Sequence, residues 1–250
     1  MNVNYKPMSC SECLNGAGLD FDFTMAYQPI FNIQSKTIFA HEALVRGKEN
    51  QSAYSILSKV NDENRYRFDQ ACRVKAIEMA SRLSMNSLLS INFLPNAIYN
   101  PETCIRTTVE ASYKYNFGID KIILEVTEGE KVEDHAHLLS IIKEYKRQGI
   151  KTAIDDFGAG YSGLNLLSEF QPDFIKIDMA LVRGIDKDRI RRSIIKGIML
   201  VCQEIDIQVI AEGIETEEEY KALEDLGINL IQGYYFCKPV FEGLGSYKFS

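Results

Sequence analysis

The feature that most constrains the fold is the alternation of strand-like and helix-like segments along most of the chain. Eight runs are rich in β-branched or aromatic residues, as is typical of strands. They span residues 23–31, 37–45, 88–94, 121–126, 151–157, 173–178, 207–214 and 230–236. Segments with helical periodicity, among them 66–83, 132–148, 189–204 and a capped start at 216–219, lie between the later runs. This order predicts parallel strands joined by crossover helices.

The first two runs depart from this order. Only residues 32–36 separate them, which is too short for a crossover, so the two runs should form an antiparallel hairpin. Eight strands in 250 residues match the size of a closed barrel. We therefore expect an α/β fold, a TIM-like (β/α)8 barrel with the first strand antiparallel to the others. An open doubly wound sheet is the alternative. Residues 1–20 are expected to be an N-terminal extension and residues 21–250 the barrel domain.

Charge and hydropathy restrict the partners of the chain. The net charge is −7 and the sequence pI is about 5.2, which argues against DNA as a partner because phosphate binding needs a surplus of basic residues. No apolar run approaches the length of a membrane span, so no membrane partner is expected. The N-terminus has no apolar core and does not resemble a signal peptide. We expect a cytoplasmic protein with reduced cysteines.

One cysteine pair lies in a polar segment. Cys10 and Cys13 form a CxxC, which is half of a zinc site, and no second CxxC or nearby CxxH completes it. Two surface cysteines are the favoured interpretation. A metal or redox site, including a zinc ion shared between two copies of the chain, is the alternative. The other cysteines fall in apolar patterns and are expected in the core: Cys72, Cys104, Cys202 and Cys237.

Polar side chains recur at or near the C-terminal halves of the strand-like runs. The set comprises Gln28, Glu42, Arg46, Asn92, Glu125, Glu128, Asp155, Asp156, Lys176, Asp178, Glu212, Glu215 and Gln232. Any one of these could be a paired or solvent-facing group at a strand end. Barrel enzymes, however, build their active sites at these ends, and buried unpaired charges are costly. The recurrence therefore predicts a single shared site.

The residue types in this set indicate metal chemistry. Glu42, Asn92, Glu125, Asp155 and Asp156 are hard oxygen donors, which suit Mg²⁺ or Mn²⁺ better than zinc. Adjacent aspartates at a strand end are typical of a two-metal centre, in which Asp155 would bridge both ions and Asp156 would hold the second. Such centres usually hydrolyse phosphoesters.

The remaining ionisable groups fit the same chemistry. Lys176 and Glu212 are candidates to orient a nucleophilic water or to accept its proton. Arg46 suits a substrate phosphate, which a guanidinium can bind in bidentate fashion. Gly158 and Gly160 form only a GxG, a weak signal for a nucleotide loop, so we expect a loop that closes near the metal ions.

Several motifs together make the sequence resemble a known family. They are EALVR (42–46), YQPI (27–30), INFLP (91–95), LEVTE (124–128), IDDFGAGYS (154–162), DFIKID (173–178), AEGIET (211–216) and QGYYFCKP (232–239). In order and spacing they are similar to those of the EAL-domain family, bacterial phosphodiesterases that cleave cyclic di-GMP to the linear dinucleotide pGpG. The resemblance covers about residues 21–242. It implies a barrel with one antiparallel strand, in agreement with the hairpin above.

The resemblance also implies roles for individual residues. Glu42, Asn92, Glu125, Asp155 and Asp156 are similar to the metal ligands, and Lys176 and Glu212 to the groups around the catalytic water. Glu128 resembles the glutamate that steadies the loop after the paired aspartates. The positions implied or grouped near the substrate are Gln28, Leu44, Arg46, Asp178, Glu215 and Gln232. The metal ions would be two Mg²⁺ or Mn²⁺ per site, and family members commonly form homodimers.

Two function classes follow from these observations. The first is a metal-dependent cyclic di-GMP phosphodiesterase that lowers cyclic di-GMP signalling in the control of biofilm and motility. The alternative is a non-catalytic cyclic di-GMP receptor or a protein-interaction EAL module. The intact acidic set favours the enzyme, because a receptor needs no cage of metal ligands. The sequence contains no recognisable sensor module, so a separate sensor or signalling protein is an expected partner.

Overall fold

A closed barrel of strands forms the centre of the molecule. The structure, a computed structural model, describes residues 19–95, 98, 101–127, 135–159 and 163–246. Within them one sheet runs in the order β2-β3-β4-β5-β6-β7-β8-β1-β9, and pairing of β1 with β2 closes it. The strands are β1 (Thr24–Asn32), β2 (Thr37–Arg46), β3 (Leu88–Asn92), β4 (Ile122–Thr127), β5 (Lys151–Phe157), β6 (Phe174–Ile177), β7 (Gln208–Ala211), β8 (Leu230–Ile231) and β9 (Val240–Phe241).

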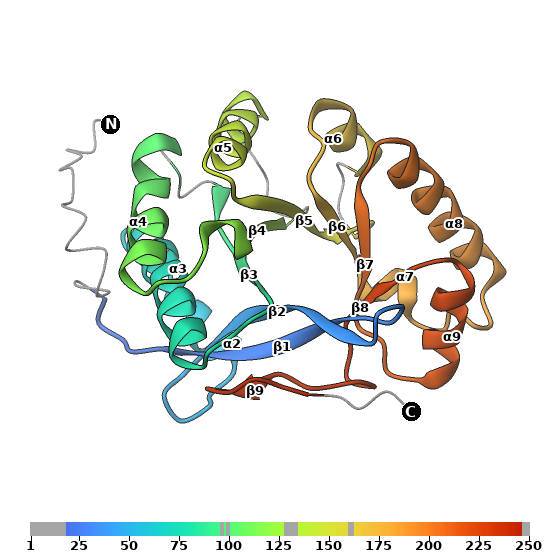
Figure 1. The fold of residues 1–250 in the computed structure, drawn as a ribbon, viewed down its shortest axis with the longest axis horizontal. Helices are drawn as coiled ribbons and strands as arrows, with labels where there is room; N and C mark the ends of the chain where they lie inside the picture. Colours follow the sequence, from blue (N-terminus) through green and yellow to red (C-terminus); the bar gives the residue numbers. More distant parts are fainter. Residues whose placement is uncertain (1–18, 96–97, 99–100, 128–134, 160–162, 247–250) are drawn as a thin grey trace.

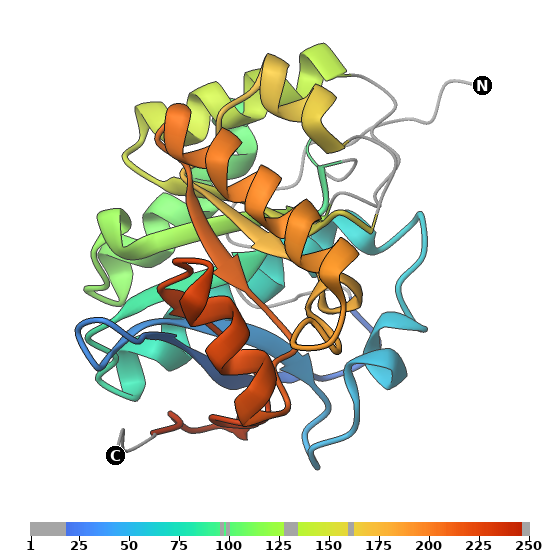
Figure 2. The same cartoon turned by 90° about the vertical axis from the view of Figure 1, so that its right-hand side faces the viewer.

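Helices surround this barrel on the outside (Figures 1 and 2). They are α2 (Ala53–Leu57), α3 (Arg65–Arg82), α4 (Pro101–Lys114), α5 (His135–Arg147), α6 (Gly163–Glu169), α7 (Met179–Val182), α8 (Arg189–Glu204) and α9 (Glu217–Asp225), with the 3-10 turn η2 (Ile119–Lys121). No helix in the described part of the chain combines the length and apolar character needed to cross a bilayer.

The reversed first strand is confirmed. Strand β1 is antiparallel to β2, with Gln28 opposite Glu42, and antiparallel to β8, with Phe31 opposite Ile231. The pairs from β2 to β8 are all parallel. The open-sheet alternative is wrong, because β1 pairs with both β2 and β8 and so closes the sheet, whereas in an open sheet β1 and β8 would not pair with each other.

The last two barrel strands are shorter than the sequence predicts. Strand β7 ends at Ala211 and β8 at Ile231, whereas the apolar runs continue to residues 214 and 236. Gly213 has a φ of +68°, which takes the chain out of the extended conformation. A Cβ on Gly233 would lie 2.1 Å from the carbonyl oxygen of Ile214, so the two segments can approach this closely only through a glycine. Gly213 therefore turns the chain after β7, and Gly233 allows the chain after β8 to pack closely against Ile214.

Several elements were not expected from the sequence, among them helices α2, α4, α6 and α7 and strand β9. Helix α4 begins with Pro101, a favoured residue at the first helical position, and buries Cys104, Ile105 and Ala111. Strand β9 pairs with β1 through Val240 opposite Tyr27, along the part of β1 that β8 does not reach (Figure 1). A two-residue strand has no periodicity of its own, so it could be found only from its partner.

The cysteine predictions have a mixed outcome. Cys104 and Cys202 are buried in the core as expected, whereas Cys72 and Cys237 are only partly buried. Cys10 and Cys13 lie outside the described residues.

The barrel interior is built in two layers of opposite character. The lower layer is an apolar cluster separate from the main core, with one residue from almost every strand: Ile30, Ala40, Ile123, Ala153, Phe174, Ile210 and Leu230. Alternate residues of a strand share a face, so the next interior residue lies two positions after each of these, or two positions before it on the reversed strand β1. Those residues are Gln28, Glu42, Glu125, Asp155, Lys176, Glu212 and Gln232. A polar layer therefore rests directly on an apolar floor.

We predict a pH dependence of stability from His41, the neighbour of Glu42 on β2. Its ring is buried, and Nδ1 lies 2.8 Å from the Ser87 hydroxyl oxygen. Burial lowers the pKa of His41 from 6.5 to about 4. Between these values the unfolded chain binds a proton that the folded chain does not, so folding stability falls as the pH drops through this range.

Urea unfolding of the parent and of His41→Gln at pH 6.5 and pH 5 tests this. The parent should lose about 2 kcal/mol more free energy of unfolding between the two pH values than the variant, which lacks the titrating ring. Equal losses in the two proteins would contradict a buried neutral histidine.

Candidate active site

The ammonium group of Lys176 lies at the centre of the polar layer. Its Nζ is 2.9 Å from Glu125 Oε2, 3.0 Å from Asp155 Oδ1 and 2.7 Å from Glu212 Oε1. Glu42 Oε2 lies somewhat further away, at 3.5 Å. Four strands, or the residues directly after them, thus supply four carboxylates to one lysine. The side chain of Lys176 is 1% exposed, so these carboxylates replace water around the charge.

Amide and hydroxyl groups fix the orientation of the carboxylates. Glu42 Oε1 accepts a hydrogen bond from Asn92 Nδ2 at 3.1 Å, and Oε2 accepts one from Gln232 Nε2 at 2.9 Å. Ser90 donates from its hydroxyl to Glu125 Oε1. Ser90 was not among the site residues expected from the sequence. The strand alternation could have found it, because it lies two residues before Asn92 on β3.

The paired aspartates diverge because the strand is irregular between them. The register of β5 against β6 shifts between Ile154 and Phe157, and Asp156 has a φ of 55°, in the left-handed region. The Asp156 amide donates to Asp155 Oδ1 at 3.0 Å. We expected Asp156 to turn out of the strand where the strand ends. Instead β5 continues through Phe157, and the irregularity turns Asp156 within the strand.

The carboxylates form two overlapping groups that could each hold a cation. One group is Glu42, Glu125 and Asp155, and the other is Asp155, Asp156 and Glu212; within each, one oxygen per residue lies within 4.8 Å of the others. Asp155 belongs to both. The donors are all oxygens, which suits Mg²⁺, Mn²⁺ or Ca²⁺ and not a thiolate-preferring metal.

Crowding and burial change the protonation behaviour of this cluster. Burial raises the pKa of Glu125 to about 8, with Lys176 acting in the opposite direction, and burial raises the pKa of Glu212 well above its usual range. Burial and the charge of Asp155 raise the pKa of Asp156 to about 6. Burial alone would lower the pKa of Lys176, but the surrounding carboxylates hold it well above its usual range. These shifts indicate that one lysine does not provide enough positive charge to keep all of these carboxylates ionised.

The residues expected near a substrate lie at different places around the cluster. Gln28 donates from Nε2 to the Cys237 carbonyl at 3.1 Å, on the wall of a pocket of about 190 Å³. That pocket is lined by Gln28, Glu42, Met179, Glu212, Gly213, Glu215, Gln232, Gly233 and Tyr234. Leu44 lies on the wall of a separate, mainly apolar pocket, together with Asn92.

The other expected residues have local partners. Arg46, at the end of β2, donates to the Val45 carbonyl at 2.7 Å. Asp178 caps α7 by accepting from the Ala180 amide at 2.8 Å, and Glu215 pairs with Arg183 at 2.8 Å. Glu128 lies outside the described residues. The structure thus brings Glu42, Asn92, Glu125, Asp155, Lys176, Glu212 and Gln232 into one connected network, with Asp156 beside it.

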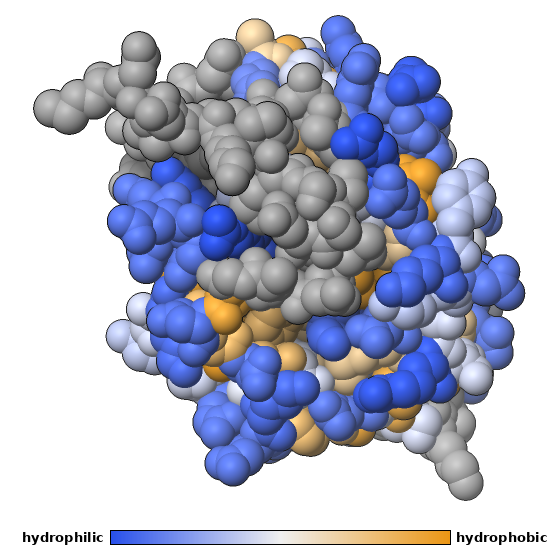
Figure 3. Space-filling view, turned by 90° about the vertical axis from the view of Figure 1, so that its left-hand side faces the viewer, coloured by the Kyte–Doolittle hydropathy of each residue, from blue (hydrophilic) through white to orange (hydrophobic). Residues whose placement is uncertain are grey.

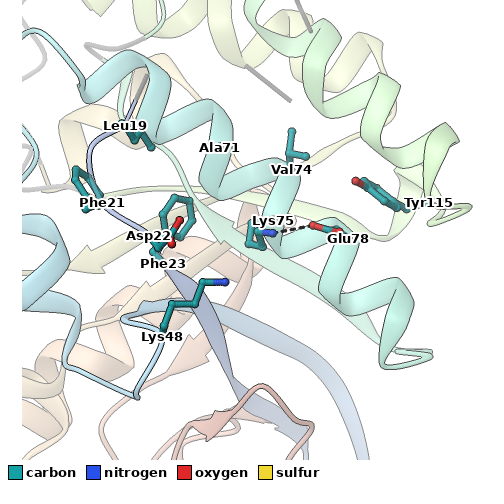
Figure 4. A pocket seen from close by; sticks show the side chains of 10 residues that line it. All are labelled: Leu19, Phe21, Asp22, Phe23, Lys48, Ala71, Val74, Lys75, Glu78 and Tyr115. Carbon is teal, nitrogen blue, oxygen red and sulfur yellow. Dashed lines mark hydrogen bonds and ion pairs between the residues drawn. The ribbon is translucent and has the colours of Figure 1, made fainter. Parts of the chain in front are cut away.

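A further pocket lies away from this network. It has a volume of about 200 Å³ and lies between the start of β1 and α3, where Lys75 pairs with Glu78 at 3.0 Å (Figure 4). None of the polar-layer residues lines it. On the left-hand side of the molecule, polar side chains dominate, and hydrophobic ones show in hollows between them (Figure 3). The pocket between the start of β1 and α3 is therefore separate from the acidic cluster.

Replacing the central cation tests the electrostatic account. In Lys176→Met, the buried carboxylates lose their shared partner, so in EDTA at pH 8 we expect the free energy of unfolding to fall by about 3–5 kcal/mol. Lys221→Met removes an exposed pair with Glu217 and should leave the free energy of unfolding close to that of the parent. Denaturant unfolding measures both variants. Equal, small effects would show that Lys176 is not the counterion on which the cluster depends.

Comparison with known proteins agrees with this geometry. The EAL domain family model matches residues 16–239. Two solved structures are similar. One is a standalone versatile EAL protein from Vibrio cholerae O395 in its cyclic di-GMP-bound form, with a TM-score of 0.90 and 56% identity over 92% of this chain and 98% of that chain. The other is Klebsiella pneumoniae BlrP1 as a manganese and cyclic di-GMP complex, with a TM-score of 0.86 and 35% identity over 90% of this chain and 57% of that one.

Two of the curated relatives that match come from Escherichia coli K12. The blue light- and temperature-regulated antirepressor BluF is 35% identical over 88% of this chain and 55% of its own length. The cyclic di-GMP phosphodiesterase PdeR is 37% identical over 56% of this chain and 21% of its own length. The chain thus spans about half or less of the length of these relatives. The family model covers most of the chain, and the fold and acidic cluster are in place, so this chain belongs to the EAL domain family.

Proposed function

We propose that this chain is a cyclic di-GMP phosphodiesterase that hydrolyses cyclic di-GMP to linear pGpG with the aid of two divalent cations, Mg²⁺ or Mn²⁺. The observation that carries the proposal is the convergence of Glu42, Glu125, Asp155 and Glu212 on Lys176, with two three-carboxylate groups that share Asp155. Shared carboxylates between two ions are typical of centres that cleave phosphoesters.

The charge of the site supports two ions. Five carboxylates (Glu42, Glu125, Asp155, Asp156 and Glu212) and one ammonium group, when ionised, leave four net negative charges. Two divalent cations would neutralise them. This compensation would favour the approach of a dianionic substrate, because like charges repel strongly in a partly buried site.

The residues divide into metal ligands and groups that act on water or substrate. Glu42, Asn92, Glu125, Asp155 and Asp156 would hold the cations, which supply charge neutralisation at the phosphoryl group and help to activate water. Lys176 and Glu212 contact each other at 2.7 Å. The Lys176 ammonium group would orient the attacking water, and Glu212 in its ionised form would take up the proton of that water.

The remaining proposed contacts involve the substrate and the loop. Gln28, Leu44, Arg46, Asp178, Glu215 and Gln232 are proposed to contact the nucleotide. Glu128 is proposed to steady the loop after Asp156.

The relatives support the substrate and the metal. PdeR carries the name of a cyclic di-GMP phosphodiesterase, and the Vibrio and Klebsiella structures contain cyclic di-GMP, the second with manganese. Through that activity the chain would lower cyclic di-GMP signalling in the bacterial cytoplasm, in the control of biofilm and motility. We propose that it acts as a homodimer and responds to a separate sensor or signalling protein.

A receptor without turnover is the second candidate. BluF is similar over 88% of this chain and is named an antirepressor, which is a regulatory role. The complete set of carboxylates around Lys176 favours the enzyme, since recognition of a ligand does not require a cluster with this charge.

A direct assay separates the two candidates. The purified chain is incubated with cyclic di-GMP in Mg²⁺, in Mn²⁺ or in EDTA, and the products are resolved by anion-exchange chromatography. We expect pGpG in the presence of either metal and none in EDTA. Retained binding of cyclic di-GMP without any pGpG would establish the receptor instead.

Loss of one metal ligand tests the site assignment. We expect Glu42→Ala to reduce turnover by about 100-fold and to weaken Mn²⁺ binding measured by calorimetry, because it removes a carboxylate of the first three-residue group. Glu78→Ala, which removes a carboxylate paired with Lys75 outside the site, is the matched control and should leave both unchanged. Parental activity in Glu42→Ala would contradict the assignment.

A further inference from the structure

The buried carboxylate of Glu219 lies outside the acidic cluster. It is in the first turn of α9 and is 2% exposed. Its Oε1 accepts a hydrogen bond from the Gly184 amide at 2.9 Å, and its Oε2 accepts bonds from the amides of Glu215 at 2.9 Å and Thr216 at 3.3 Å. One side chain thus accepts from three backbone N–H groups.

Only part of this arrangement is explained by helix capping. Thr216 and Glu219 form a capping box, in which the Glu219 amide donates to Thr216 Oγ1 at 3.2 Å. A capping box needs the Thr216 amide alone. The bonds from Gly184 and Glu215 are additional, and Gly184 belongs to a different segment, which follows α7.

Arg183 strengthens the link between the two segments. Its Nη1 lies 3.3 Å from both carboxylate oxygens of Glu219. Its Nη2 donates to the Gly213 carbonyl at 3.1 Å and lies 2.8 Å from Glu215 Oε1. Together, Arg183 and Glu219 tie residues 213–216, which follow β7, to residues 183–184, which follow β6 and α7. We call this set of contacts the Arg183–Glu219 clamp.

The two tied segments carry the active-site groups at their starts. Lys176 is on β6, and Glu212 directly follows β7 and reaches back to Lys176. Gly213 packs tightly beside Met179, since a Cβ at Gly213 would lie 2.4 Å from the Met179 Cβ. Met179, Glu212, Gly213 and Glu215 also line the same pocket beside the cluster. The clamp therefore fixes the part of the pocket wall formed by residues 212–215 relative to the adjacent part formed by Met179.

The clamp depends on the ionised form of Glu219. Burial alone would raise the pKa of Glu219, but the backbone amides of Glu215, Gly184 and Thr216 and the charge of Arg183 hold it below its usual value. An ionised carboxylate offers two acceptor oxygens, whereas the amide of glutamine offers one. Glutamine at this position could keep the volume but not all of the bonds.

We infer that Glu219 is a positioning residue, which through Arg183 and three backbone amides holds the segment that carries Glu212 in place against Lys176 and the substrate pocket. This role rests on the proposed phosphodiesterase activity. Glu219 does not line the pocket beside the cluster, so we expect its loss to lower turnover more than substrate affinity. Small displacements of catalytic groups have large effects on rate, because the reacting geometry is narrow.

The test compares Glu219→Gln with Glu217→Gln. Glu217 lies on the same turn of α9 and has an exposed pair with Lys221 at 2.6 Å, so it is a matched control. In Glu219→Gln we expect kcat to fall about tenfold and KM to change less than about threefold. Amide hydrogen exchange at Gly184, Glu215 and Thr216 should accelerate, and calorimetric Mn²⁺ binding should stay as in the parent. The control should match the parent throughout.

Arg183→Met provides the same test if Glu219→Gln folds poorly, since the Arg183 side chain is 39% exposed and is easier to remove. It should lower kcat in the same direction by a smaller factor. Faster exchange with parental kcat in either variant would overturn the positioning role while leaving the phosphodiesterase intact. Unchanged exchange in both would refute the clamp itself. Absence of turnover in the parent would instead refute the proposed function and, with it, any role of Glu219 in catalysis.

Discussion

The contact between the Lys176 ammonium group and four carboxylates is the interaction on which the rest of the site depends. In a buried layer, four acidic side chains from different strands would repel one another, and burial would favour their neutral forms. Lys176 gives all four a common partner between 2.7 and 3.5 Å away. The arrangement keeps the carboxylates together and yet leaves the cluster with more negative charge than one lysine can balance. This excess is what makes the site suitable for divalent cations.

The position of the cluster follows from the geometry of the barrel. Alternate residues on each strand point inward, and an apolar floor that includes Ala40, Ile123 and Phe174 fills the lower interior. The next inward residues are Glu42, Glu125 and Lys176. The floor closes the interior on one side, so the polar groups face the other end of the barrel, where the carboxyl ends of the parallel strands lie. The alternation of inward-pointing residues also explains why Ser90 joins the network, although it carries no charge and was not expected as a site residue from the sequence.

Much of this could be predicted because it is periodic or local. The short link between the first two strands predicted a hairpin, and the recurrence of polar residues at or near the C-terminal halves of the strand-like runs predicted a shared site. The features that could not be predicted depend on contacts between distant segments. The irregularity that turns Asp156 arises from pairing with β6, and the early ends of β7 and β8 arise from packing at Gly213 and Gly233. Likewise, Thr216 and Glu219 formed a visible capping motif, but the bond from Glu219 to Gly184 has no local signal.

The central claim is that Asp155 is shared between two cations. The most direct measurement is anomalous diffraction at the manganese absorption edge from crystals grown with Mn²⁺ and cyclic di-GMP. The account predicts two manganese peaks in each chain. One lies among Glu42, Glu125 and Asp155, the other lies beside Asp155 and Asp156, and Asp155 contacts both. A single peak that Asp155 does not share, or no peak within the cluster while cyclic di-GMP is bound, would contradict it.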